Sequence, residues 1–337
     1  MNMPKKVLVL GATGAMGQYL VPELANMGYQ VDAVSLDADS VQNRFSNVRY
    51  IQGDAGDLPF LFHLFENRYD GIVDFMIYAS ERLIRFLPLM LDNTGHYIYL
   101  SSYRVYDNLE VPVRESSPRL LDSSENVLLK CSDDYSICKA RGEDVIRAAG
   151  KKMNWTIIRP SITYSRMRYQ LVTLEAPNTV GRAFAGKKVV LPEQARNVDA
   201  TMTWAGDNAR MIARLLFRDG VFGEAYNMTT AEHRTWGEIA DYYKDICNLD
   251  AVWVDKEDYI RLLCPDIYNP GCRWQLEYDR LFTRIMDNSK LLNATGMSQC
   301  DLKPLYDGLK YEIERCPKDT VWRVNTAMDE YVKNHFV

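Results

Sequence analysis

The stretch VLVLGATGAMG, residues 7–17, decides the fold of this chain. Four apolar residues indicate a short buried strand, and glycines at positions 11, 14 and 17 end it in a turn. Residues 18–27 follow with apolar side chains at helical spacing. Glycines spaced in this way permit a tight turn, close approach of backbone to a pyrophosphate, and close packing of helix on strand. The pattern therefore predicts a strand, a phosphate-binding turn and a helix.

A dinucleotide site needs more than glycines, because turns use glycine for conformational reasons alone. NAD sites usually carry an acidic residue at the end of the second strand, where it binds the ribose hydroxyls. Asp37 follows the strand predicted at residues 31–36 and is the candidate, although a solvated turn aspartate explains it equally well. No basic residue follows that strand until Arg44, which favours NAD over NADP.

The rest of the N-terminal half repeats the alternation of strand and helix. Such alternation predicts crossover connections and a parallel sheet that helices cover on both faces. Pro160 is expected to end the pairing of its strand, because proline lacks the N–H that a ladder needs. The further strands are expected at residues 48–52, 71–78, 97–100, 155–158 and 225–228.

We therefore predict an α/β protein: a Rossmann-type, doubly wound parallel sheet with a smaller, mostly helical C-terminal substrate lobe. Residues 1–165 would form the NAD-binding domain, to which residues 204–230 return. Residues 166–203 and 231–337 would form the substrate-binding lobe, and aromatic residues are frequent in its second part.

Composition narrows the function further. Lys and Arg number 40 against 45 Asp and Glu, so the chain has no net positive field to attract nucleic acid, and no such partner is expected. No apolar stretch approaches the roughly 18 residues that span a bilayer. Seven cysteines without a CxxC pair indicate reduced thiols, and four scattered histidines give no metal site. We expect a cytoplasmic protein without a membrane partner.

Tyr135 and Lys139 are the candidate catalytic pair. They lie four residues apart in a predicted helix, so they share one face. A nearby ammonium would lower the pKa of the tyrosine toward the range of a general acid or base. Ser102 follows a predicted strand at the edge where α/β sheets bind ligands. A lone YxxxK arises easily by chance among 21 tyrosines, but the order of turn, serine and YxxxK favours an active site.

At this point the sequence resembles the extended short-chain dehydrogenase/reductases, the NAD-dependent epimerases and dehydratases of nucleotide sugars. The resemblance rests on the following segments: GATGAMG (11–17), GD (53–54), YIYLSSYRVY (97–106), YSICK (135–139) and IIRP (157–160). It implies a homodimer, although the segment between Met76 and Ser102 is shorter than in related epimerases.

The resemblance also implies roles for individual residues. Ser102, Tyr135 and Lys139 would be catalytic: Tyr135 exchanges a proton with the sugar hydroxyl, Ser102 hydrogen-bonds the same oxygen, and Lys139 holds the nicotinamide ribose. Asp54 would bind the adenine amino group. The residues expected to bind the cofactor are Gly11, Thr13, Gly14, Ala15, Met16, Gly17, Asp37, Asp54, Ala55, Lys139 and Pro160.

The expected substrate is a nucleotide-activated sugar, oxidised by hydride transfer from C4. Substrate contacts are expected from Ser102, Tyr135, Arg104 and Arg273. Arg273 and Arg280 are the two arginines that could clamp a diphosphate. Alternatively, Arg104 and Arg273 are ordinary exposed arginines on helices and do not contact the substrate. A dehydratase carries an acidic pair after the serine, where this chain has Tyr103 and Arg104. We therefore expect an epimerase. The alternatives are an NAD(P)H-dependent ketoreductase and a non-catalytic, cofactor-sensing or RNA-binding member of the family.

Overall fold

The computed structural model describes residues 4–38, 41–149, 153–264, 266, 268 and 270–336. Within these residues a seven-stranded sheet has the order β11-β6-β5-β4-β1-β2-β3, and all its neighbouring strands are parallel. The doubly wound fold predicted from the sequence is confirmed. The strands are β1 (Lys6–Leu10), β2 (Gln30–Ser35), β3 (Val48–Gln52), β4 (Tyr69–Asp74), β5 (Thr94–Leu100), β6 (Trp155–Pro160) and β11 (Glu224–Met228).

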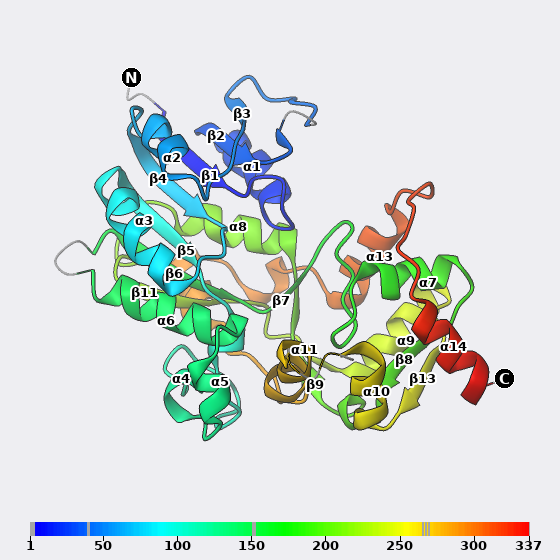
Figure 1. The fold of residues 1–337 in the computed structure, drawn as a ribbon. Coiled ribbons are helices and arrows are strands. Elements are labelled where there is room, and N and C mark those ends of the chain that lie inside the picture. Colours follow the sequence, from blue (N-terminus) through cyan, green and yellow to red (C-terminus); the bar gives the residue numbers. More distant parts are fainter. Residues whose placement is uncertain are drawn as a thin grey trace.

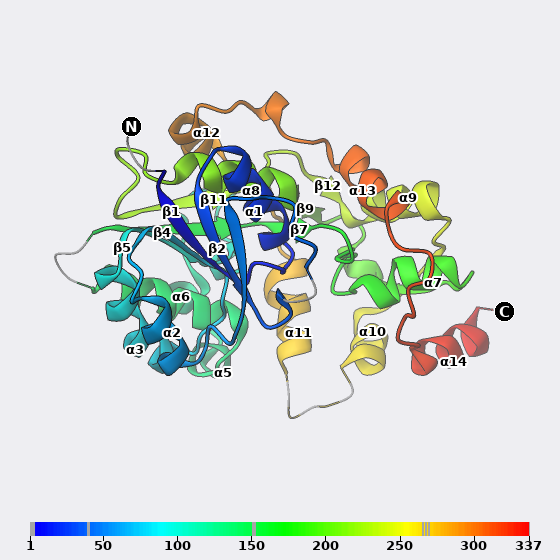
Figure 2. The same cartoon turned by 90° about the horizontal axis from the view of Figure 1, so that it is seen from above.

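Helices cover both faces of the sheet, as Figure 2 shows. Strand β1 explains why both layers are needed: Val7 and Val9 pack on one side, Leu8 and Leu10 on the other, and all four side chains are fully buried. One layer contains α1 (Gly17–Asn26), α8 (Ala205–Leu215) and α12 (Ser289–Thr295). The other contains α2 (Leu58–Leu64), α3 (Ser80–Asp92) and α6 (Tyr135–Arg147).

The C-terminal elements gather beside the sheet and have a core of their own (Figure 1). Trp236, Tyr243 and Tyr259 are among the largest side chains buried there. The helices are α7 (Val180–Phe184), α9 (Trp236–Cys247), α10 (Lys256–Leu263), α11 (Gly271–Gln275), the π-helical turn η5 (Leu276–Arg280), α13 (Leu305–Glu314) and α14 (Thr326–His335). Two short strands, β8 (Val189–Pro192) and β13 (Ala251–Val254), pair in parallel.

Short elements connect the sheet to this lobe. Strand β7 (Ile162–Tyr164) pairs in parallel with β10 (Met202–Trp204), and β9 (Asp199–Ala200) pairs antiparallel with β12 (Arg234–Thr235). After β5 the chain forms the 3₁₀ turn η2 (Tyr103–Val105) and the helices α4 (Leu120–Ser123) and α5 (Val127–Cys131). The remaining 3₁₀ turns are η3 (Ala176–Asn178), η4 (Glu193–Ala195) and η6 (Gln299–Asp301).

Three expectations are corrected. Strand β4 ends at Asp74 rather than at residue 78. Strand β6 continues through Pro160, which pairs with Met228 as the last residue of an inner strand. Reduced thiols were expected throughout, but Cys264 and Cys272, beside the facing ends of α10 and α11, form a disulfide with their Cα atoms 5.7 Å apart.

Candidate active site

One cavity of about 540 Å³ lies at the carboxyl ends of the parallel strands. This edge is where open α/β sheets bind their ligands. The glycine turn and the ends of β2 and β3 form one end of it, which we call the turn end. Side chains after β5 and β6 and from the C-terminal lobe form the other, the arginine end. The residues of the arginine end are Tyr103, Arg104, Arg168, Gln170, Glu175, Gln275 and Arg280, and Ser102 and Tyr135 lie between the two ends.

The turn end has the shape that a dinucleotide requires. Gly11 has φ +82°, a conformation that favours glycine. A Cβ on Gly17 would collide with the carbonyl oxygens of Gly11 and Ala12, so the helix can start this close to the strand only with glycine. Within the described residues, the amides of Thr13, Ala15 and Met16 donate no hydrogen bond to the chain. These amides are available to an anion at the start of α1.

Acidic side chains stand at the rim of the turn end. The hydroxyl of Thr13 donates to Asp37 Oδ1 over 2.6 Å, and this hydrogen bond holds the pKa of the carboxyl below its usual value. Asp54 Oδ1 accepts from the amide of Gly56 at 2.7 Å. Ala55 and Pro160 also line the cavity. All residues expected to bind the cofactor, except Lys139, lie on its wall.

Ser102 and Tyr135 meet between the two ends. Asp134 caps α6 by accepting from the amide of Ser136 at 2.9 Å, which starts the helix with Tyr135 as its first residue. Ser102 caps η2 in the same way: its Oγ accepts from the amide of Arg104 at 3.2 Å. Both side chains line the cavity, and Ser102 lies near enough to Tyr135 to lower the pKa of its phenol. The structure therefore brings together two of the three residues predicted to be catalytic.

The pKa of Tyr135 is shifted in the direction opposite to the one expected. Burial raises it above its usual value, and this effect exceeds the lowering caused by the nearby Arg104, Ser102 and Arg168. The prediction of a lowered pKa for Tyr135 is therefore wrong. It ignored burial, which cannot be read from a motif.

Lys139 lies behind the cavity wall and is 1% exposed. Its ammonium donates to the carbonyl oxygens of Leu100 at 2.6 Å and Met76 at 3.3 Å, and lies 5.8 Å from the centre of the Tyr135 ring. Burial lowers the pKa of Lys139 to about 8, although the nearby Asp74 opposes the shift. The amine is thus fixed between the ends of β4 and β5.

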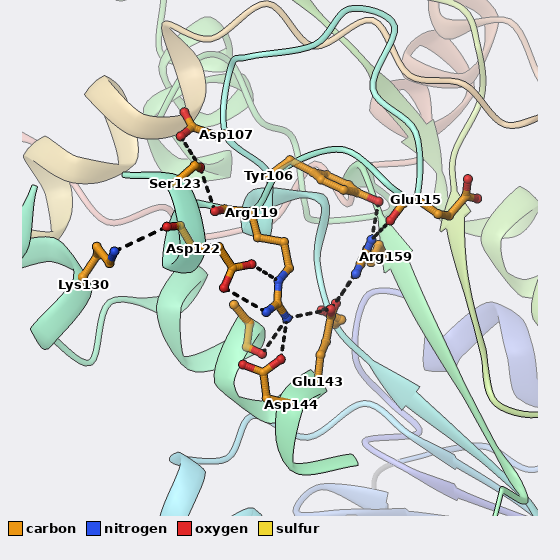
Figure 3. Close-up of polar contacts among 12 residues, drawn as sticks. Tyr106, Asp107, Glu115, Arg119, Asp122, Ser123, Lys130, Glu143, Asp144 and Arg159 are labelled. Atoms are coloured by element: carbon orange, nitrogen blue, oxygen red, sulfur yellow. Dashed lines mark hydrogen bonds and ion pairs between the residues drawn. The ribbon is translucent and has the colours of Figure 1, made fainter. Parts of the chain in front are cut away.

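A buried ion pair fixes helix α6 against the sheet (Figure 3). Glu143 lies one turn beyond Lys139 and binds Arg159 of β6 through both carboxylate oxygens, at 2.7 and 2.6 Å. It also accepts from Ser101 at the end of β5. Burial alone would raise the pKa of Glu143, but Arg159 and the other partners hold it below its usual value. These contacts set the register of α6 and hence the positions of Tyr135 and Lys139.

Charged side chains dominate the arginine end. Asp279 of η5 forms ion pairs with Arg280 and, at 3.4 Å, with Arg104 Nε. Arg284 Nε lies 3.6 Å from the other oxygen of the same carboxylate. Arg168 follows β7 and has no carboxylate partner among the described residues. Three cations around one carboxylate, with Arg168 on the same wall, make this end suited to an anionic ligand.

Arg273 does not lie in the cavity. Its guanidinium binds Glu257 at 2.7 Å and Glu277 at 3.3 Å on the surface between α10 and α11. The expected substrate contact is therefore corrected, and Arg280 occupies the cavity in its place. No sequence motif marks Arg168 or Asp279. The folding of the C-terminal lobe places Arg168 on the cavity wall and Asp279 against Arg104 and Arg280.

A match to a known protein family agrees with a dinucleotide site at the turn end. Residues 11–189 match the family described as NAD(P)H-binding, and this region is more than half of the chain. The chain belongs to this NAD(P)H-binding family. No curated protein matches it in sequence.

Solved structures resemble this NAD(P)H-binding protein over most of its length. An epimerase from Methanothermobacter thermautotrophicus is 16% identical, with a TM-score of 0.72, covering 92% of this chain and 91% of its own. The dTDP-glucose 4,6-dehydratase from Bacillus anthracis is 18% identical, with a TM-score of 0.66 and coverages of 92% and 96%. UDP-glucuronic acid 4-epimerase from Bacillus cereus, solved with UDP-glucuronic acid and NAD, is 16% identical, with a TM-score of 0.67 and coverages of 92% and 99%.

At these identities the likeness shows the fold. It is the fold of epimerases and dehydratases, as the resemblance to extended short-chain dehydrogenase/reductases implied. In the described part of this NAD(P)H-binding protein, no helix is long and apolar enough to cross a membrane. The same residues contain no group of three or more His, Cys, Asp or Glu side chains placed to hold a metal ion.

Proposed function

We propose that this protein is an NAD-dependent epimerase that reversibly oxidises C4 of a nucleotide-activated sugar. The observation that carries the proposal is the position of the Ser102 and Tyr135 side chains. Both line one continuous cavity, between a turn suited to a dinucleotide and an end suited to an anion. The hydroxyl groups of Ser102 and Tyr135 can act there on an alcohol group of a substrate that is held between the dinucleotide and the arginine end.

The turn end fits NAD. Amides of the glycine turn would hold the pyrophosphate, Asp37 the adenosine ribose, and Asp54 the adenine. A carboxylate such as Asp37 would repel the 2′-phosphate of NADP, and no lysine or arginine lines this end of the cavity among the described residues. When bound, NAD supplies a hydride acceptor that no side chain can replace.

Ser102 and Tyr135 would bind the substrate hydroxyl and transfer its proton. Ser102 would donate a hydrogen bond to the C4 oxygen, and the Tyr135 phenolate would take the hydroxyl proton as the C4 hydrogen leaves as hydride. A ketone results, and return of hydride and proton on the opposite face of the sugar gives the epimer. Tyr103 and Arg104 stand where a dehydratase carries its acidic pair, which favours epimerisation over loss of water.

The arginine end supports a sugar nucleotide as the substrate. Arg168 and Arg280 can both bind phosphate through planar, bidentate contacts. Structural neighbours that act on dTDP-glucose and bind UDP-glucuronic acid have the same fold. The shared chemistry is a diphosphate that joins a sugar to a nucleoside.

Turnover should be tested with UDP- and dTDP-hexoses that carry deuterium at C4. We expect an epimeric product that retains the deuterium, without net formation of NADH, because the enzyme returns the hydride it takes. A ketoreductase would consume NADH in proportion to product, and a non-catalytic protein would form no product; either result would overturn the proposal.

Tyr135→Phe should lower turnover by at least about 100-fold, since a positioned general base contributes roughly that much. Binding of NAD, measured by calorimetry, should be nearly unchanged. Tyr278→Phe is the matched control, because its hydroxyl accepts from Asn126 outside the cavity. A Tyr135→Phe enzyme with the parent's turnover would contradict the role assigned to the phenol.

A further inference from the structure

Two cations lie against the ring of Tyr135. The guanidinium carbon of Arg104 is 5.3 Å from the ring centre, and Lys139 Nζ is 5.8 Å from it. The amine of Lys139 donates to the backbone carbonyls of Met76 and Leu100, and Lys139 itself does not line the cavity. Arg104 instead lines the cavity, on the same wall as the phenol. Arg104 is therefore the nearer of the two cations to the Tyr135 ring.

Arg104 is held rigidly. Its amide binds the Oγ of Ser102 in the turn η2. Its guanidinium pairs with Asp134 at 3.7 Å and with Asp279 at 3.4 Å, and its side chain is 13% exposed. Asp134 directly precedes Tyr135, so the carboxylate that starts helix α6 also ties the guanidinium to the tyrosine.

We propose that Arg104 acts through Tyr135, by stabilising the phenolate while it accepts the proton of the substrate. This inference rests on the proposed function for its catalytic meaning, but its physical content concerns the chain alone. Arg104 is a positioning residue here. It does not need to touch the substrate, because its charge acts on the ring that does.

Charged and polar groups from several segments act on Tyr135. Arg104 comes from η2, Arg168 from the loop after β7, Asp279 from η5, Lys139 from α6, and Ser102 from the end of β5. Among those that lower the pKa of Tyr135 against the effect of burial, Arg104 contributes most, and Asp279 acts in the opposite direction. The two carboxylates that bind Arg104 reduce its effect without cancelling it.

The two cations also differ in the pH range over which they stay charged. Burial lowers the pKa of Lys139 to about 8, so its charge declines as the solution becomes alkaline. A guanidinium remains protonated throughout that range. Arg104 would therefore keep the phenolate accessible at pH values where Lys139 is becoming neutral.

Loss of Arg104 should raise the pKa of Tyr135. A nearby cation favours the charged phenolate and lowers the pKa of Tyr135, so removal of the cation raises it. For a unit charge at 5 to 6 Å that carboxylates partly neutralise, we expect a rise of about one pH unit. Arg104→Lys keeps the charge and should restore most of the parent's value.

The test is a titration of protein labelled with ¹³C at tyrosine Cζ, followed by NMR without substrate or cofactor. Comparison with Tyr135→Phe assigns the resonance. Arg104→Gln should raise the midpoint of Tyr135 by about one pH unit, and Arg104→Lys by much less. The surface variant Arg273→Gln serves as control for the loss of an arginine. An unchanged midpoint in Arg104→Gln, with a shift in Lys139→Met alone, would overturn the proposal.

Kinetics give a second, separate test. In the deuterated-sugar assay, Arg104→Gln should shift the acid limb of the kcat profile to higher pH by the same amount and leave KM nearly unchanged. A raised KM with an unshifted profile would mean that Arg104 binds substrate instead, and would also overturn the proposal. If the protein turns over no sugar nucleotide, the proposed function fails, but the NMR titration still decides what Arg104 does to Tyr135.

Discussion

The two ends of the cavity are built in different ways. The turn end depends mainly on backbone: the segment from β1 into α1 supplies its amides, and the ends of β2 and β3 complete it. The arginine end comes from side chains that three separate segments contribute: Arg104 of η2, Arg168 after β7, and Arg280 of η5, which pairs with the neighbouring Asp279. Backbone geometry depends on local glycines, whereas a cluster of charges depends on how distant segments pack.

This difference indicates which end tolerates change. Dinucleotide binding depends on amides and on the absence of side chains, so a single added side chain can block it. The arginine end depends on buried charges that balance one another, so loss of one charge leaves others without a partner. The following predictions separate these two kinds of dependence.

The largest effect is expected at the ion pair that positions helix α6. Glu143→Gln would leave the buried Arg159 without a carboxylate, and loss of one partner of such a pair typically costs about 3–5 kcal/mol. Urea denaturation should show this loss in the free energy of unfolding. Replacing both residues with leucine removes the charge imbalance and should cost less. If Glu143→Gln is as stable as the parent, the pair does not fix the helix.

Gly14→Val should break the turn end and leave the arginine end intact. A Cβ on Gly14 would meet only the carbonyl oxygen of Gly11, at 3.3 Å, so the fold can accept it with a small shift. The added side chain would obstruct the approach of the pyrophosphate. We expect NAD to bind about 100-fold more weakly by calorimetry, about 3 kcal/mol, with little change in melting temperature. Undiminished NAD binding would show that the cofactor lies elsewhere.

Arg273→Gln should have the smallest effect. Its ion pairs with Glu257 and Glu277 are partly exposed, and such pairs contribute about 0–1 kcal/mol to stability. KM for the sugar nucleotide should not change, because the side chain lies outside the cavity. A large rise in KM would show that Arg273 contacts the substrate and belongs to the arginine end.

The same contrast explains how much the sequence could predict. Glycines 11, 14 and 17 mark a local backbone shape, and the strands of the sheet are continuous apolar runs, so the fold and the turn end followed from the pattern. The meeting of Ser102 with Tyr135 followed from the order of strand ends in a parallel sheet. Arg168 and Asp279 had no motif, because only the tertiary packing of the C-terminal lobe brings Arg168 to the cavity and Asp279 to the arginines that line it.

Other features depended on burial, which the sequence does not display. Tyr135 was expected to have a lowered pKa, but desolvation outweighs the cations around it. Arg273 and Arg280 looked equivalent in the sequence, yet one is a surface residue and the other is 4% exposed. Cys264 and Cys272 have no pairing motif, and their disulfide depends on the approach of two helices.

The central claim is that the phenol of Tyr135 and a bound nicotinamide act on one substrate in this cavity. Rapid mixing of NAD-loaded protein with a sugar nucleotide that it turns over, followed by the fluorescence of reduced nicotinamide, tests it most directly. We predict a transient of enzyme-bound NADH that forms within a single turnover, decays as the epimer appears, and is absent in Tyr135→Phe. Epimer formation without that transient in the parent, or an equal transient in Tyr135→Phe, would contradict the account.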